Sequence, residues 1–180
     1  MSDIVLQPAG RLDGGDGPLL SVNDLTVEFH TDDGIVHAVS DLSYELHPGE
    51  TLGIMGESGS GKSVSVQALM GLIPQPPGKI VSGSIMYAGL GADVDLISMP
   101  DRQQRSIRGT EIAMIFQDPL TSLNPVFPVG WQLGETLRIH RGASRREAQK
   151  RAVSLMEQVG IPNAKARARQ FPHQFSGGMR

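Results

Sequence analysis

The sequence contains no cysteine, which excludes disulfide bonds and thiolate metal sites within its 180 residues. It has no run of about 18 or more apolar residues, the length that a membrane-spanning helix needs. The formal net charge is only −3, so bulk charge does not indicate a nucleic-acid partner. Residues 1–6 lack the basic and long apolar regions of a secretory signal. We therefore expect a cytoplasmic protein whose membrane role, if it has one, comes through a partner.

The first part of the chain predicts an antiparallel pair of strands behind a flexible lead-in. Residues 1–18 are rich in Gly, Asp and Pro and predict the lead-in. Apolar residues then alternate over Leu19–Phe29, with one slip at Asn23–Asp24. A turn signal at residues 31–34 separates this run from a second one, Ile35–Leu46.

The middle of the chain predicts an α/β core. Short apolar runs bounded by turns, at Thr51–Met55 and Ile112–Phe116, are typical of buried strands of a parallel sheet. Between them we expect a helix over Lys62–Ile73 that prolines end, a strand over Gly83–Ala88, and a short helix within residues 100–110.

From Val129 onward the apolar period becomes helical. The clearest helix spans Ser144–Val159, because Ser144 and Glu147 form a capping-box pattern and Gly160 supplies a C-cap. Its apolar face is Ala148, Ala152, Leu155, Met156 and Val159. The basic residues between 138 and 169 are interpreted as a solvated helical surface.

One segment predicts phosphate binding directly. Residues 56–63 match G-x-x-x-x-G-K-[ST] in full, after an apolar run and before a helix. Glycines let such a loop curl so that its N–H groups face phosphate oxygens, and the helix dipole adds to the attraction. The lysine places a cation by the β- and γ-phosphates, and the serine hydroxyl suits Mg²⁺. The predicted ATP-binding residues are Gly56, Glu57, Ser58, Gly59, Ser60, Gly61, Lys62 and Ser63.

Several further segments resemble those of ATP-binding subunits of ABC transporters, over about residues 20–180. Ile115-Phe-Gln-Asp-Pro resembles the Q-loop, which implies that Gln117 is catalytic and, with Ser63, ligates Mg²⁺. Phe29 falls where the family places an aromatic residue that stacks on adenine. Phe175-Ser-Gly-Gly-Met-Arg resembles the signature motif. The resemblance implies that its central residues bind the ATP held by the opposite subunit: Ser176, Gly177 and Gly178.

This resemblance implies the fold and the partners. The fold class is α/β, a P-loop NTPase core with an N-terminal antiparallel β part and a helical subdomain. We expect the core at 19–128 and the helical subdomain at 129–180, ending at the signature motif. Implied partners are ATP and Mg²⁺, a second ATP-binding subunit, transmembrane permease subunits and, indirectly, a solute-binding protein. The implied location is the cytoplasmic face of the membrane, as a peripheral subunit.

A narrower resemblance concerns the transported solute. Residues 116–125 and 171–180 resemble the oligopeptide and dipeptide importer branch, as do residues 38–43 ahead of 48–53. Met179 stands where the general signature has Gln, and this same branch commonly shows that change. Uptake of peptides is therefore the favoured function, with nickel or another solute as the alternative.

Parts of the family pattern are not found in the sequence. No apolar strand ending in Asp-Glu follows Ser63, and no histidine loop follows the signature motif. The resemblance makes those residues responsible for holding Mg²⁺, polarising water and contacting the γ-phosphate. We therefore expect an incomplete core, marginal stability and little ATPase activity from this chain alone. The simplest interpretation is a fragment of a longer ATPase.

Two other functions remain open. The chain could be a truncated subunit that binds ATP and regulates without hydrolysing it. It could also be a soluble P-loop enzyme such as a kinase, although the signature motif and the Q-loop argue against that. A coding sequence that continued past Arg180 into a strand ending in Asp-Glu would favour the transport ATPase.

Overall fold

A computed structural model describes residues 17–117 and 122–179. The predicted lead-in over residues 1–16 lies outside the described residues, as do residues 118–121 of the loop after Gln117, and Arg180. The chain divides into two compact units, residues 1–112 and 113–180, and each is described by itself.

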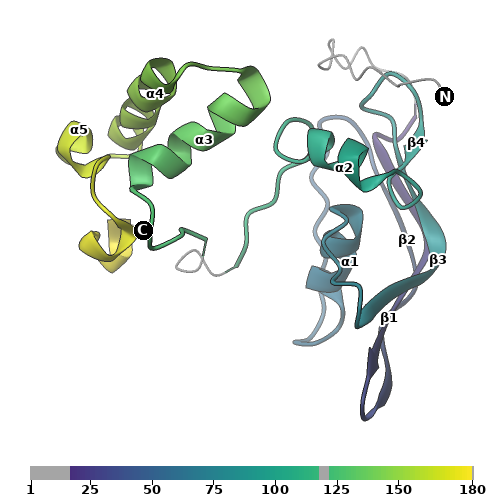
Figure 1. Cartoon of the computed structure of the whole chain (residues 1–180). Helices are drawn as coiled ribbons and strands as arrows, with labels where there is room; N and C mark the ends of the chain where they lie inside the picture. The colour runs from purple at the N-terminus through teal and green to yellow at the C-terminus, as the bar shows by residue number, and fades with distance from the viewer. Residues whose placement is uncertain (1–16, 118–121, 180) are drawn as a thin grey trace. The chain divides into compact units, whose positions relative to one another are not determined.

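The first unit is built on a four-stranded antiparallel sheet (Figure 1). Its strands are β1 (Leu20–Thr31), β2 (Gly34–Leu46), β3 (Gly78–Tyr87) and β4 (Val94–Asp95), in the order β2-β1-β3-β4. Thr31 pairs with Gly34, so a two-residue connection joins β1 and β2. The predicted antiparallel pair is confirmed. The strand expected at Gly83–Ala88 is also present, and it begins earlier, at Gly78.

The predicted slip in β1 is an irregularity of the sheet. The register with β2 shifts between Val22 and Leu25, and Asp24 takes a left-handed conformation with φ 47°. The amide N–H of Asp24 donates to the Ser43 hydroxyl at 2.9 Å. A polar side chain thus satisfies a backbone group where the ladder is interrupted, and the apolar alternation resumes on the same face.

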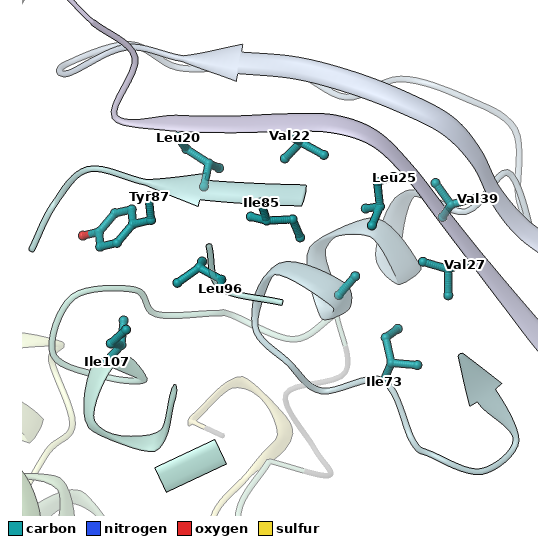
Figure 2. Close-up of a cluster of buried hydrophobic side chains, with 11 residues drawn as sticks. Leu20, Val22, Leu25, Val27, Val39, Ile73, Ile85, Tyr87, Leu96 and Ile107 are labelled. Carbon is teal, nitrogen blue, oxygen red and sulfur yellow. The ribbon is translucent and has the colours of Figure 1, made fainter. Parts of the chain in front are cut away.

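The core of this unit lies on one face of the sheet. Figure 2 shows side chains of β1 and β3 converging with others from the segments that cover them. Leu25, Val27 and Ile85 are fully buried at its centre. The other buried members are Leu20, Val22, Val39, Ala68, Ile73, Tyr87, Leu96 and Ile107.

Two helices pack with this sheet. Helix α1 (Lys62–Leu69) is shorter than predicted, because Gly71 takes a left-handed conformation with φ 60° and ends the helix before the prolines. Helix α2 (Asp101–Ile107) confirms the short helix expected within 100–110. Just after it, the Arg108 guanidinium donates to the carbonyl oxygens of Met70 and Gly71 at 2.7 and 2.8 Å. Those bonds satisfy acceptors that the end of α1 leaves free.

Both predicted buried strands of a parallel sheet are wrong. Residues 51–55 form no strand and have exposed side chains, with Met55 95% exposed. Ile112 makes only an isolated bridge to Arg108, and Ile115 is 98% exposed. A central strand takes its hydrogen bonds and apolar cover from neighbouring strands, and no described segment pairs with residues 51–55 or 113–116.

The second unit is helical (Figure 1). It contains α3 (Val129–Arg141), α4 (Arg145–Gln158) and α5 (Ala164–Arg167), followed by the 3₁₀ turns η1 (Pro172–Gln174) and η2 (Gly177–Met179). The expected apolar face of α4 is confirmed at Ala148, Ala152 and Met156, which are buried, whereas Val159 at the helix end is 75% exposed. None of the helices in residues 17–117 and 122–179 is long and apolar enough to cross a membrane.

The predicted capping box of α4 is confirmed. The Ser144 hydroxyl accepts from the amide N–H of Glu147, and the Glu147 carboxylate accepts from the amide N–H of Ser144 at 3.0 Å. The same hydroxyl donates to that carboxylate at 2.6 Å. These bonds hold the pKa of Glu147 below its ordinary value, the side-chain bond from Ser144 contributing most.

Replacing Ser144 with alanine should lower the free energy of unfolding of the helical unit by about 1 kcal/mol, since the N-cap acceptor is lost. Urea unfolding followed by far-ultraviolet circular dichroism measures this. The matched control is Ser154→Ala inside the same helix, which should not destabilise because alanine is the better helix former.

The pKa of Glu147 gives this prediction a pH dependence. A carboxylate whose pKa is lowered by folding stabilises the folded state. That stabilisation is complete at a pH above the ordinary carboxyl pKa, and it is lost as the pH falls through the lowered pKa. The difference between wild type and Ser144→Ala should therefore shrink in acid. A difference that stays constant from neutral pH to acid would contradict the carboxylate's part in the cap.

Candidate nucleotide-binding site

The loop at residues 56–63 is tightly curled. Gly59 and Gly61 have φ angles of 82° and 83°, a region that favours glycine. A Cβ on Gly61 would collide with the carbonyl oxygen of Ala38, and one on Gly56 would lie 2.5 Å from the Ser60 hydroxyl oxygen. Backbone conformation therefore favours glycine at positions 59 and 61, and the backbone of Ala38 leaves no room for a side chain at 61.

The lysine of the motif folds back over its own loop. Its Nζ atom donates to the carbonyl oxygens of Gly56 and Glu57 at 2.7 and 2.5 Å, and to the Ser60 hydroxyl at 3.1 Å. These partners span five positions of the loop, so the ammonium group sits inside the curl. A cation in that position is placed to meet a phosphate group that enters the loop.

Helix α1 begins directly at Lys62, with Gly61 as its N-cap. No acidic residue lies in its first turn and no side chain caps it, so its positive N-terminal end is left available for an anion. Ser63, the predicted Mg²⁺ ligand, is the second residue of the helix and is exposed.

Ser65 anchors the helix start, and the sequence analysis missed it. It is 1% exposed, and its hydroxyl donates to the carbonyl oxygen of Lys62 at 2.8 Å. Its amide N–H donates to the carbonyl oxygen of Gly61 at 2.9 Å. A serine three residues after the motif lysine and three before the helix's apolar Ala68 was the available signal, because a polar residue there falls on the buried side.

The loop forms one side of a pocket of about 420 Å³. Strand β2 forms another side with residues 37–40 and Leu42, and Ile54 and Met55 complete it. Small-molecule sites commonly have volumes of about 300–1,000 Å³. His37 at this wall has its Nδ1 atom 3.2 Å from the Glu28 carboxylate. Nothing in the sequence pattern indicated that β2 contributes to the site.

Phe29, the predicted adenine-stacking residue, lies at the edge of the core. It is half-buried and packs against the hydrophobic cluster of the first unit. A Cβ on Gly78, its partner on β3, would lie 3.1 Å from the Phe29 ring. Phe29 is not among the described residues that line the pocket. Its role toward adenine stays a prediction.

The other predicted site residues belong to the second unit. Gln117 is exposed at the end of the first described stretch. Ser176, Gly177 and Gly178 are also exposed, and the amide N–H of Met179 closes their turn on the carbonyl oxygen of Ser176 at 2.9 Å. Buried Phe175, 5% exposed, ties this turn to the helical core. The roles of these residues toward ATP and Mg²⁺ stay predictions.

Curated proteins that resemble this chain are transport ATP-binding proteins by name. The oligopeptide transport ATP-binding protein OppD of Bacillus subtilis is 51% identical over 162 residues, which are 90% of this chain and 44% of OppD. The dipeptide transport protein DppD of the same organism is 48% identical over 90% of this chain and 47% of DppD. A putative peptide import ATP-binding protein of Brucella abortus is 49% identical over 91% of this chain and 48% of that protein. The chain thus spans about half the length of these relatives.

Solved structures share the fold. The dimeric ATP-binding cassette MJ0796 bound to ADP and phosphate has a TM-score of 0.70 at 23% identity, covering 89% of this chain and 64% of that one. A second dimeric structure of MJ0796, described as a bacterial ABC transporter cassette, has a TM-score of 0.72 at 25% identity with the same coverage. These similarities confirm the predicted fold class, in which this chain covers only part of the cassette.

The ABC transporter family matches residues 39–180, a stretch that contains the whole curled loop, Gln117 and the signature segment. Together with relatives close to 50% identical over nine-tenths of the sequence, this match shows that the chain belongs to the ABC transporter family.

Proposed function

We propose that this chain acts as the ATP-binding part of an ABC importer that takes up peptides. The observation that carries the proposal is the curled loop at residues 56–63, with the Lys62 ammonium group inside it and a pocket of about 420 Å³ in front of it. A triphosphate would replace the loop carbonyls as partner of Lys62 and accept hydrogen bonds from the start of α1.

Magnesium fits the chemistry of its two predicted ligands, Ser63 and Gln117. The exposed Ser63 hydroxyl at the helix start is a hard oxygen ligand of the kind that Mg²⁺ prefers, and Gln117 offers an amide oxygen. When bound, the ion would neutralise phosphate charge during hydrolysis. The chain's own contribution is to hold the triphosphate with Lys62 and with the backbone N–H groups of the loop.

The signature turn supports a paired arrangement. Ser176, Gly177 and Gly178 present an exposed hydroxyl and exposed backbone that Phe175 holds from below. We infer that they bind the ATP held by a second ATP-binding subunit, and the solved cassettes with this fold are dimeric. The remaining partners of the proposal are permease subunits and, through them, a solute-binding protein. The subunit would then work at the cytoplasmic face of the membrane.

Peptide uptake rests on the relatives. Those compared above are named for oligopeptide, dipeptide or peptide transport. Since permeases and binding proteins select the solute, the ATP-binding chain carries this specificity only by association. The alternative is transport of nickel or another solute, and an uptake assay distinguishes it from peptide transport.

Replacing Lys62 with alanine should weaken binding of Mg·ATP about tenfold to a hundredfold, because a charge-assisted contact to the phosphates is lost. Isothermal titration calorimetry on the purified chain measures this. Lys150→Ala, on α4 in the other unit, is the matched control and should bind like wild type. Equal affinity of the Lys62→Ala and wild-type chains for Mg·ATP would contradict the proposed site.

Disrupting the gene in its host should reduce uptake of a radiolabelled oligopeptide to background, with uptake of a free amino acid unchanged. A plasmid copy should restore uptake, and so should the copy with Lys150→Ala. A copy with Lys62→Ala should not, because ATP binding drives the transport cycle. Normal peptide uptake together with lost nickel uptake would instead assign the alternative solute.

A further inference from the structure

A second pocket lies within the helical unit, and none of the site residues assigned above lines it. Its volume is about 380 Å³, and residues of α3, of α4 and of the stretch just after α5 line it. Three arginines contribute to its wall, one from each of these places: Arg138, Arg145 and Arg169. Trp131 and Gln149 also line it.

Small residues build the floor of this pocket. A Cβ on Gly130 would lie 2.7 Å from the Cβ atom of Ala168, and one on Gly134 would lie 3.2 Å from that of Ala148. The amide N–H of Gly130 also donates to the carbonyl oxygen of Ala168 at 2.9 Å. The backbones therefore approach closely, and the long side chains around them enclose a hollow.

The three guanidinium groups have no counter-ion in the described part of the chain. No carboxylate oxygen of residues 17–117 or 122–179 lies within 4.0 Å of them. The carboxylate nearest in sequence to Arg145, that of Glu147, is engaged by Ser144 in the capping box. Arg138 is half-buried, where an unpaired charge costs more than on an open surface. An anion that bridged the three groups would remove this cost.

An aromatic ring stands beside the charges. The Trp131 ring stacks on that of Phe127 with centroids 4.5 Å apart and planes 19° from parallel. It nevertheless remains 41% exposed. Small-molecule sites typically combine an apolar or aromatic surface with a few polar groups that orient the ligand. A large, rigid, partly exposed ring next to several hydrogen-bond donors fits that description.

We propose that this pocket binds a small organic or inorganic anion bearing phosphate or carboxylate groups, held by Arg138, Arg145 and Arg169 beside Trp131. A solvated basic face would need neither a hollow nor convergence from three separate places in the chain. The volume suits a small molecule better than an extended segment of a partner. The site is independent of the ATP site proposed above.

The chain offers its own reporter for a test, because Trp131 is its single tryptophan. The intrinsic fluorescence of the full chain should be titrated with pyrophosphate and, separately, with citrate. The titration uses the Lys62→Ala variant, in which pyrophosphate binding at the curled loop is weakened and contributes less. We expect a saturable change in emission, and the better of the two probes identifies phosphate or carboxylate as the preferred group.

Variants decide whether the arginines carry the binding. Arg138→Gln, Arg145→Gln and Arg169→Gln should each weaken the response about tenfold or more, because each removes a charge-assisted contact. Arg146→Gln is the matched control, since Arg146 lies on α4 beside Arg145 but does not line the pocket. If half-buried Arg138 proves necessary for folding, as judged by circular dichroism, the exposed Arg145 and Arg169 carry the same comparison.

Four outcomes would overturn the proposal. One is an emission that neither probe changes. Another is a non-saturating change that sodium chloride of equal ionic strength reproduces, which would mark general screening of surface charge. The third is a response only to an acidic peptide such as oligoglutamate, and the fourth is a response that Arg146→Gln weakens as much as the three pocket variants do. Either result would assign the basic residues to a protein partner.

Discussion

The close approach of Gly61 to the carbonyl oxygen of Ala38 is the contact on which the candidate ATP site depends. No side chain fits there, so strand β2 can press against the start of α1. This places residues of an antiparallel sheet beside a phosphate-binding loop and turns the loop into one side of a pocket. Ser65, buried beneath, holds the first turn of the helix in place. Lys62 then closes the curl from inside.

Local patterns predicted much of this structure. The irregularity at Asn23–Asp24, the turn before Gly34 and the capping box of α4 all depend on interactions between near neighbours or on strict alternation. The loop at residues 56–63 was predictable for the same reason, because its own backbone geometry favours glycine at positions 59 and 61. The family match extends that local evidence to the fold.

What the sequence did not predict depends on distant partners. Residues 51–55 have the composition of a buried strand, but composition cannot supply the neighbouring strands that such a strand needs. Residues of different elements form the wall that β2 gives to the loop pocket, and residues of different elements also supply the three arginines of the pocket in the helical unit. Periodicity within one element carries no information about either. Phe29 was assigned to adenine from its position along the chain; it packs at the edge of the core, and its role toward adenine stays a prediction.

The central claim is that the curled loop receives the phosphates of ATP. Amide chemical-shift mapping by NMR on the isotope-labelled chain, with and without Mg·ATP, tests it most directly. The account predicts that the largest shifts fall on residues 56–63 and on the first turn of α1, with smaller ones on residues 37–40 of β2. Shifts that leave this loop unchanged and concentrate elsewhere would contradict it.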